Sequence, residues 1–299
     1  MEGALVAELL PQPLILAGAG WDDYALVDSG NGLTFERYGP YRFIRPEAQA
    51  LWQPRLEEWD ADGEFVPASD EDGGGRWQFR RAVPREGWPL AREDVRFTAQ
   101  CTPFRHLGFF PDMAPVWDWM GGELAGGELS TLNLFGYTGV GTLALSQYGP
   151  VTHVDASKKS VAQARENAAL SGMAERPIRW IVDDATKFAA REVRRERRYD
   201  GIILDPPKFG RGPEGEVWRL EDHLPPLIAD CRQLLDERSR FLFLTVYAVR
   251  MSALALAGLL DEAFAGMPGS IEFGDLAVRE DHPEGRLLPT AIFARWRNG

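Results

Sequence analysis

The chain has 299 residues, of which 44% are hydrophobic, and this length predicts about two domains with a sizeable core. Its formal net charge of −12 argues against a protein that wraps long stretches of nucleic acid, but it leaves a small RNA contact open. Two distant cysteines, Cys101 and Cys231, exclude a disulfide framework, and the four histidines show no metal-ligand spacing. We therefore expect a globular, cytoplasmic protein without a metal ion.

The N-terminus carries no recognisable targeting signal. Met1–Leu10 contains two glutamates, lacks a basic start and is followed by Pro11 and Pro13. No apolar run approaches the ~18 residues that a membrane span needs. We expect no membrane partner.

The first third of the chain is typical of short strands. Tyr24–Val27 and Tyr41–Ile44 resemble strands, and glycine-containing turns follow or precede them. Acid-rich Asp60–Gly75 is expected to be a solvated loop. We predict a smaller, mainly β N-terminal domain over residues 1–100 that can form a wall of the substrate site. Packing is the favoured role for its large aromatic residues Trp77, Phe79 and Trp88.

From about residue 130 the pattern alternates between strands and helices, which is typical of a parallel sheet covered on both faces. Expected strands lie near 131–136, 150–155, 178–182, 199–204 and 239–246. Expected helices lie near 139–148, 157–171, 185–197 and 219–236.

The C-terminal part adds a helix near 251–265 and two strands near 270–278 and 288–296. The tight return between these strands predicts that the last one runs antiparallel. An α/β domain over residues 101–299, with seven strands in a Rossmann-like sheet, is therefore expected.

A glycine-rich turn follows the first of these strands. Leu132–Thr142 has the order Gly-x-x-Gly-x-Gly, which matches neither the dinucleotide fingerprint nor a phosphate loop, because Thr142 stands where the phosphate loop needs lysine. Gly136 and Gly139 let the backbone approach a ligand, and the next helix can present N–H groups to a carboxylate such as that of S-adenosylmethionine (SAM). A purely structural strand-to-helix turn is the alternative.

Acidic residues follow the next two strands. Asp155 lies nineteen positions after Gly136, close to the offset at which a carboxylate reaches ribose hydroxyls. Asp183 and Asp184 end the third strand, where a carboxylate can accept a hydrogen bond from an adenine amino group. Either residue can instead cap the following helix.

The fourth strand ends in Asp205-Pro206-Pro207-Lys208. The prolines fix the backbone, so the Pro206 carbonyl and the Asp205 side chain can hold an exocyclic amino group. Methyl transfer to that nitrogen depends mainly on position, because SAM supplies the reactive group. The alternative is a plain Asp-Pro turn.

On these motifs the chain resembles the bacterial large-subunit ribosomal RNA methyltransferases of the I and K/L type, within the class I SAM-dependent superfamily. The matching stretches are 132–141, 151–172, 181–188 and 202–209, with a looser match over 28–52. The resemblance implies a seven-stranded SAM-binding sheet with the acceptor at Asp205, Pro206 and Pro207. Residues expected to bind SAM are Phe135, Gly136, Tyr137, Thr138 and Gly139 at the methionyl end, Asp155, Ala156 and Ser157 at the ribose, Asp183, Asp184 and Ala185 at the adenine, and Asp205.

Several positions depart from the family pattern. His106–Met113 resembles the segment that closes over the cofactor, but Met113-Ala114 replaces the usual Gln-Arg after Asp112. No cysteine follows the fifth strand, so cytosine C5 methylation, which needs a covalent nucleophile, is disfavoured unless Cys101 or Cys231 reaches the site. Lys208 stands where an aromatic residue often stacks on the acceptor, and Phe209 can replace it or pack in the core. No PUA-like RNA-binding domain is recognisable.

The leading hypothesis is therefore a methyltransferase that acts on a nitrogen of a nucleobase, in ribosomal RNA, with Asp205 orienting the acceptor. The alternatives are a methyltransferase acting on a protein side chain or a small molecule, and a SAM-binding module that does not catalyse. Two further segments have open roles. His282 is expected to form a turn or overhang the acceptor, and Arg191–Arg198 to be a solvated helix face or an RNA contact.

Overall fold

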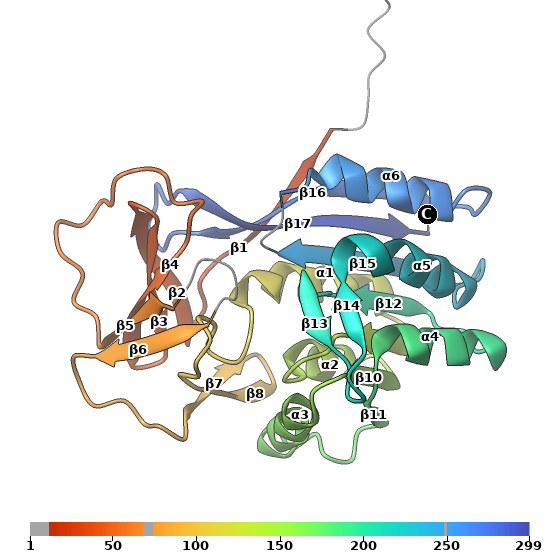
Figure 1. The fold of residues 1–299 in the computed structure, drawn as a ribbon, viewed down its shortest axis with the longest axis horizontal. Coiled ribbons are helices and arrows are strands. Elements are labelled where there is room, and N and C mark those ends of the chain that lie inside the picture. The colour runs from red at the N-terminus through yellow and green to blue at the C-terminus, as the bar shows by residue number, and fades with distance from the viewer. Residues whose placement is uncertain (1–11, 69–73, 248–249, 299) are drawn as a thin grey trace, which may run out of the picture.

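A computed structural model describes residues 12–68, 74–247 and 250–298. It contains a large eight-stranded sheet in the order β1-β16-β17-β15-β12-β9-β10-β11, flanked by helices, and a smaller β domain beside it (Figure 1). Residues 1–10, for which no targeting signal is expected, lie outside the described part. Within that part, no helix is long and apolar enough to span a membrane.

The strands and helices have the following bounds, each set in chain order. The strands are β1 (Leu14–Gly18), β2 (Tyr24–Gly30), β3 (Leu33–Tyr38), β4 (Tyr41–Pro46), β5 (Gly63–Pro67), β6 (Gly75–Phe79), β7 (Trp88–Arg92), β8 (Val95–Ala99), β9 (Thr131–Leu134), β10 (Val151–Asp155), β11 (Ile178–Val182), β12 (Gly201–Leu204), β13 (Phe209–Arg211), β14 (Val217–Arg219), β15 (Phe241–Tyr247), β16 (Ser270–Arg279) and β17 (Leu287–Arg297). The helices are the 3-10 turn η1 (Pro111–Met113), α1 (Ala114–Leu124), α2 (Val140–Leu145), α3 (Lys158–Leu170), α4 (Ala185–Arg194), α5 (Leu220–Gln233) and α6 (Ala253–Ala263).

Seven strands of the large sheet have the expected arrangement. Strands β9, β10, β11, β12 and β15 are parallel, and β17 runs antiparallel to both β15 and β16, which confirms the antiparallel last strand. The eighth strand, β1, was not expected. It comes from the N-terminal part of the chain and pairs in parallel with β16. A Cβ at Gly274 would lie 1.8 Å from the Leu14 carbonyl oxygen, so a glycine at this position allows β1 to dock.

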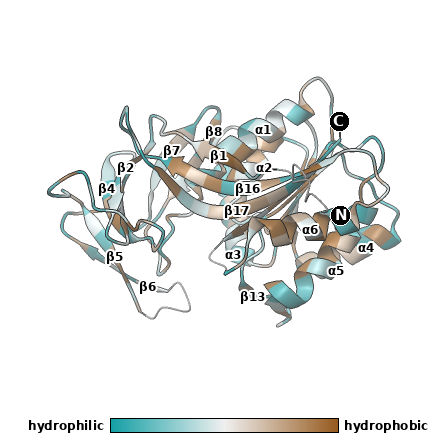
Figure 2. Cartoon of the chain, turned by 90° about the horizontal axis from the view of Figure 1, so that it is seen from above, coloured by the Kyte–Doolittle hydropathy of each residue, from teal (hydrophilic) through white to brown (hydrophobic). Residues whose placement is uncertain are grey.

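Alternating residues of the central strands belong to two hydrophobic cores, one on each face of the sheet. In β15, Phe241 and Phe243 pack with α1, α2 and their neighbours, whereas Leu242, Leu244 and Val246 pack with α4, α5 and α6. Side chains of a strand alternate between faces, so a strand buried on both faces is apolar throughout. Figure 2 shows the two layers, with hydrophobic segments of α1 and α6 on opposite sides of the sheet.

The N-terminal domain consists of a five-stranded sheet, β2-β3-β4-β5-β6, and the β7–β8 pair. Trp77 and Trp88 pack on Phe43 in its core, with ring centroids 5.2 and 5.7 Å away, and thus have the packing role expected of them. Phe79 is 48% exposed instead. The expectation of a loop over 60–75 is wrong for β5, because buried Phe65 anchors a strand within this acidic stretch. Residues 69–73 lie outside the described part.

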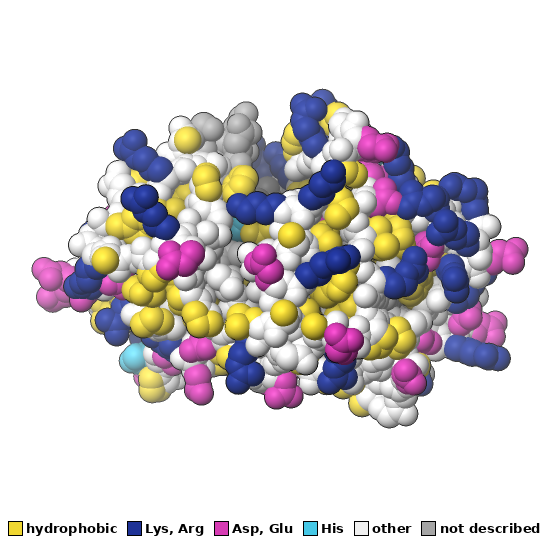
Figure 3. Space-filling model, turned by 90° about the horizontal axis from the view of Figure 1, so that it is seen from below, with side chains coloured by type: hydrophobic (Ala, Val, Ile, Leu, Met, Phe, Trp, Pro, Cys, Tyr) yellow, Lys and Arg dark blue, Asp and Glu magenta, His cyan; other side chains and the backbone are white. Residues whose placement is uncertain are grey.

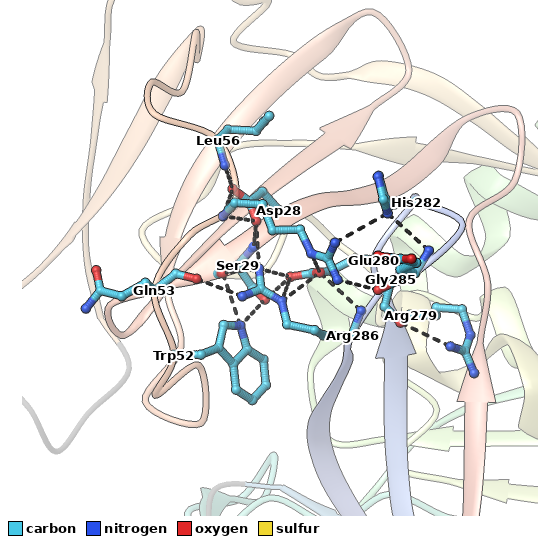
Figure 4. A network of polar contacts seen from close by, with 12 residues as sticks. Asp28, Ser29, Trp52, Gln53, Leu56, Arg279, Glu280, His282, Gly285 and Arg286 are labelled. Atoms are coloured by element: carbon cyan, nitrogen blue, oxygen red, sulfur yellow. Dashed lines mark hydrogen bonds and ion pairs between the residues drawn. The ribbon is translucent and has the colours of Figure 1, made fainter.

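A buried polar network joins the N-terminal domain to the long β16–β17 hairpin (Figures 1 and 4). The guanidinium of Arg286 donates to Asp28, at 2.9 Å, and to Glu280, at 2.7 Å. Both carboxylates are 1% exposed. The Ser29 hydroxyl also donates to Glu280, at 2.6 Å. Arg286 therefore pairs with two buried carboxylates from different parts of the chain, and Arg55 also pairs with Glu280, at 3.3 Å.

Hydrogen bonds keep these carboxylates ionised. Burial on its own opposes ionisation of Asp28, but donors including the Leu56 amide and the Trp59 indole lower its pKa overall. The pKa of Glu280 is lowered in the same way, by Arg286 and Ser29 against the effect of burial. Lowered carboxyl pKa values stabilise the fold above the unfolded-state pKa, and that contribution is lost as pH falls through the native value.

We expect Arg286→Met to lower the free energy of unfolding by about 3 kcal/mol or more at pH 7, because it leaves buried Asp28 without a cation and Glu280 with Arg55 alone. Urea denaturation followed by circular dichroism measures the change. The matched control is Arg80→Met, which removes an exposed ion pair to Glu64 and should change stability little. Equal stability of the two variants would contradict the role of the network.

Candidate functional site

A cavity of about 520 Å³ lies at the carboxyl ends of β9, β10, β11 and β12, which is where parallel α/β sheets bind ligands. Its volume is in the range typical of small-molecule sites. Most of the expected site residues line this cavity. Its complete lining consists of Phe104, Arg105, His106, Phe110, Phe135, Tyr137, Val154, Asp155, Ala156, Ser157, Asp183, Asp184, Ala185, Asp205, Pro206, Pro207, Lys208, Gly210, Arg211, Gly212, Trp218 and Tyr247. Gly136, Thr138 and Gly139 line a small adjoining pocket that shares Asp205 with the cavity.

The glycine-rich turn between β9 and α2 has an unusual backbone. Phe135 and Tyr137 have φ values of 60° and 48°, and Gly139 has a φ of 80°. Non-glycine residues rarely adopt positive φ, and such strain is concentrated at ligand sites. Gly136 is required by space, because a Cβ there would lie 2.5 Å from the ring of His153.

Neighbouring residues hold this turn in place. Buried His153 shares a hydrogen bond of 2.9 Å with the Thr142 hydroxyl. That hydroxyl also accepts a hydrogen bond from the Asn133 side chain. Burial lowers the pKa of His153 to about 3, so the ring is neutral. The Thr138 hydroxyl donates to the Gly108 carbonyl at 2.5 Å, which ties the turn to the segment before α1.

Asp155 lies at the end of β10 with both carboxylate oxygens directed at backbone N–H groups. One oxygen accepts from Tyr137 at 2.9 Å and the other from Ser157 at 2.8 Å. Burial raises the pKa of Asp155, although these two hydrogen bonds oppose the rise. The carboxylate thus links the glycine-rich turn to the start of α3 and lines the cavity between them.

Asp183 and Asp184 have different roles. Asp184 caps α4 by accepting from the amides of Thr186 and Lys187, both at 3.0 Å. The Asp183 carboxylate is bound by Arg191 and by the Asp184 amide. Both residues line the cavity, so the capping alternative is realised by Asp184 without removing it from the site.

Asp205-Pro206-Pro207 lies at the end of β12, and the short β13–β14 hairpin follows it. Trp218 of β14 donates from its indole N–H to the Pro207 carbonyl at 2.6 Å and packs on Phe135 with ring centroids 5.0 Å apart. The hairpin therefore fixes the turn that carries Asp205. The sequence pattern alone does not predict this hairpin, and its only local signal is the set of glycines at 210, 212 and 215 between Phe209 and Val217.

Aromatic residues form the opposite wall of the cavity. His106 stacks on Phe104, with ring centroids 5.6 Å apart and an interplanar angle of 2°, and contacts Phe110 and Tyr137. Burial, together with the charges of Arg45 and Arg105, lowers the pKa of His106 to about 4, so its ring is neutral. Tyr247, at the end of β15, packs on Phe110 at 5.2 Å and completes the wall.

Two carboxyl groups, those of Asp112 and Asp205, interact electrostatically beside this wall. Asp112, 4% exposed, accepts a hydrogen bond from Thr290 at 2.6 Å. Burial and then the charge of Asp112 raise the pKa of Asp205 well above its usual range. Burial and the charges of both aspartates also raise the pKa of Tyr247, so its hydroxyl stays protonated. The residues come from three separate segments, and no sequence spacing indicates their proximity.

Several candidates from the sequence lie elsewhere. Neither cysteine lines the cavity, and burial raises the pKa of Cys101 to about 12 and that of Cys231 further, so neither is a thiolate. His282 forms the turn between β16 and β17, where its ring accepts from the Glu284 amide at 3.1 Å. Phe209 neither lines the cavity nor packs in the core, because it is 54% exposed on the hairpin. Within the described chain, no group of His, Cys, Asp and Glu side chains could hold a metal ion.

Comparisons with known proteins now identify the fold and the cofactor. No family model matches the chain. A SAM-dependent methyltransferase from Agrobacterium tumefaciens is 45% identical, with a TM-score of 0.91, over 96% of this chain and 94% of that one. The chain belongs to the SAM-dependent methyltransferases. SAM is therefore the cofactor of this methyltransferase, as the glycine-rich turn and Asp155 predict.

Curated relatives are similar in sequence to parts of this methyltransferase. Ribosomal RNA large subunit methyltransferase K/L of Desulfotalea psychrophila is 30% identical over 54% of this chain and 22% of that protein. The putative ribosomal RNA large subunit methyltransferase YwbD of Bacillus subtilis is 24% identical over 62% of this chain and 50% of that protein. The chain thus spans half or less of these relatives. The fold also matches SMU.776, a putative methyltransferase complexed with SAH, with a TM-score of 0.69 and 16% identity over 92% of this chain and 75% of that one.

We propose that Asp155 binds the ribose hydroxyls of SAM, because its partly buried carboxylate lines the cavity and has further acceptor lone pairs. Asp155→Ala should then raise the Kd for SAM at least about tenfold, since hydrogen bonds to a charged group contribute about 1.5–3 kcal/mol. Isothermal titration calorimetry measures the Kd. Asp261→Ala on the exposed face of α6 is the control. An unchanged Kd in a folded Asp155 variant would exclude this role.

Proposed function

We propose that the methyltransferase transfers a methyl group from SAM to a nitrogen of a nucleobase in ribosomal RNA. The observation that carries the proposal is Asp205, which is partly buried at the carboxyl end of β12 and directed into the cavity together with Pro206 and Pro207. Curated relatives that are named ribosomal RNA large subunit methyltransferases support RNA as the substrate.

The cavity offers complementary groups for each part of SAM. Phe135 to Gly139 would surround the methionyl end, and Asp155, Ala156 and Ser157 the ribose. Asp183, Asp184 and Ala185 would surround the adenine. When bound, SAM supplies an electrophilic methyl group on a sulfonium and leaves as S-adenosylhomocysteine.

Asp205 would accept a hydrogen bond from the acceptor amino group and align its nitrogen lone pair with the methyl group. The Pro206 carbonyl would accept the second hydrogen, and the Trp218 bond to Pro207 keeps both acceptors in place. Rates of such transfers depend strongly on alignment of the reacting atoms. The stacked rings of Phe104 and His106 would pack on the face of the acceptor base from the other side of the cavity.

The cysteines support a nitrogen acceptor over the C5 atom of cytosine. Methylation at C5 needs a thiolate that adds covalently to the ring. Cys101 and Cys231, the only cysteines of the sequence, do not line the cavity, and burial raises the pKa of both thiols. Direct transfer to a nitrogen needs no such nucleophile.

The experiment that tests the proposal is transfer of radiolabelled methyl from SAM to a fractionated lysate of a strain that lacks this gene. We expect label in large ribosomal RNA, removed by RNase. Asp205→Ala should lower the transfer rate about 100-fold or more while the Kd for SAM stays within about threefold. Label only in proteins or small molecules would refute the RNA substrate, and full activity of Asp205→Ala would refute the role of Asp205.

The raised pKa of Asp205 predicts how activity depends on pH. Only the ionised carboxylate accepts the amino hydrogen, so kcat/KM should fall as pH is lowered through this raised pKa, and the falling limb should lie above the usual Asp value of about 3.9. Asp112→Asn removes the neighbouring charge and should move the limb to lower pH. Asp118→Asn, on an exposed ion pair with Arg92, is the control. A limb that does not move in Asp112→Asn would exclude this coupling.

A further inference from the structure

We propose that the outer face of the β13–β14 hairpin binds the single-stranded RNA next to the nucleotide that is methylated. This face consists of Phe209, Arg211, Val217 and Arg219. The inference rests on the proposed function, and it assigns a role to a hairpin that the fold of the large sheet does not require.

The pairing of the two strands puts these four side chains on one face. Phe209 lies opposite Arg219, and Arg211 lies opposite Val217, in an antiparallel register. Directly opposed residues and residues two apart share a face of a β-ribbon. All four are exposed, and Phe209 and Val217 are 54% and 44% exposed. The face thus alternates cationic and apolar side chains.

The inner face of the hairpin is fixed to the acceptor site. Trp218 is 3% exposed, donates to the Pro207 carbonyl and packs on Phe135. The Leu220 amide also donates to the Lys208 carbonyl at 3.0 Å, which closes the base of the hairpin. The outer face is therefore held at a fixed position beside the cavity, and Arg211 itself lines the cavity mouth. In Figure 1 the hairpin stands in front of the large sheet.

The hairpin carries more basic than acidic side chains, namely Lys208, Arg211 and Arg219 against Glu214 and Glu216. Among the described residues, the side chains of Lys208, Arg211 and Arg219 have no ion-pair partner. The acids of the hairpin turn, Glu214 and Glu216, are instead paired with Lys187. Three free cations beside an exposed phenyl ring match a nucleic acid strand, because phosphates bind the cations and an unpaired base stacks on the ring.

The other basic stretch of the chain leads away from the cavity. Residues 191–198 comprise the end of α4 and the segment that precedes β12, so only Arg191, through Asp183, reaches a residue of the cavity. Two of its arginines are already paired, Arg191 with Asp183 and Arg195 with Glu192.

Figure 3 shows Lys and Arg side chains among hydrophobic ones on both sides of a hollow in one face of the molecule. The hairpin is the basic element that adjoins the acceptor turn.

The test uses the full-length protein and a fluorescein-labelled, mixed-sequence 15-nucleotide single-stranded RNA, with Kd measured by anisotropy at several salt concentrations. Arg211→Gln/Arg219→Gln should raise the Kd about tenfold or more and reduce the slope of log Kd against log salt by about 1.4, from two lost phosphate contacts. Phe209→Ala should raise the Kd about tenfold with an unchanged slope, because it removes stacking alone. A duplex of the same sequence should bind more weakly than the single strand.

Matched controls separate this face from general charge and hydrophobicity. Arg194→Gln/Arg197→Gln makes the same change of charge in the other basic stretch, and Phe79→Ala removes an equally exposed ring from β6. Both should bind the RNA as the wild type does, with an unchanged Kd for SAM.

The outcomes distinguish the two proposals. If the wild type methylates ribosomal RNA but the hairpin variants bind the probe with wild-type affinity and salt slope, the hairpin proposal is wrong and the proposed function stands. If the wild type neither binds the probe nor methylates RNA, the proposed function fails, and the hairpin proposal fails with it. Equal binding of duplex and single strand would overturn the stacking role of Phe209.

Discussion

The backbone of residues 135–139 is the constraint on which the site depends. The strand β9 must turn sharply into α2, and two non-glycine residues, Phe135 and Tyr137, adopt positive φ to make that turn. The carboxylate of Asp155 holds the Tyr137 amide, and the Thr138 hydroxyl is bonded to Gly108. The same carboxylate faces the cavity, so the group that stabilises the turn also belongs to the candidate ligand site.

A second constraint connects the acceptor side to the N-terminal part of the chain. The segment from Phe104 to Met113 supplies the aromatic wall and Asp112, whereas the sheet supplies Asp205 and Tyr247. Thr290 of β17 holds Asp112, and the same β16–β17 hairpin is joined to the N-terminal domain through Arg286. The acceptor side is thus assembled from elements that are distant in the sequence, and the buried ion-pair network fixes how they meet.

Local patterns in the sequence predict most of the fold and one half of the site. The apolar strands β9, β10 and β12 are each followed directly by their functional residues, so Gly136, Asp155 and Asp205 are found from the order of elements alone. The carboxyl ends of parallel strands meet at one edge, where Asp155 and Asp205 line the cavity and Gly136 lines the pocket that adjoins it. The chemical roles of the individual residues remain proposals.

Long-range contacts account for what the sequence does not predict. Strand β1 depends on space beside Gly274, and the proximity of Asp112 to Asp205 depends on tertiary packing. The strands of the β13–β14 hairpin are too short to show a clear alternation of apolar and polar residues. The sequence therefore predicts Phe209 at the acceptor or in the core, whereas it lies on the surface.

The central claim is methyl transfer to a nucleobase nitrogen. The most direct measurement is mass spectrometry of nucleosides from large-subunit ribosomal RNA, isolated from a strain lacking the gene and incubated with the enzyme and SAM carrying a trideuterated methyl group. The account predicts one labelled nucleoside whose fragments retain the methyl group on a base nitrogen. A label at C5 of a pyrimidine or on the ribose, or an RNA without label, would contradict it.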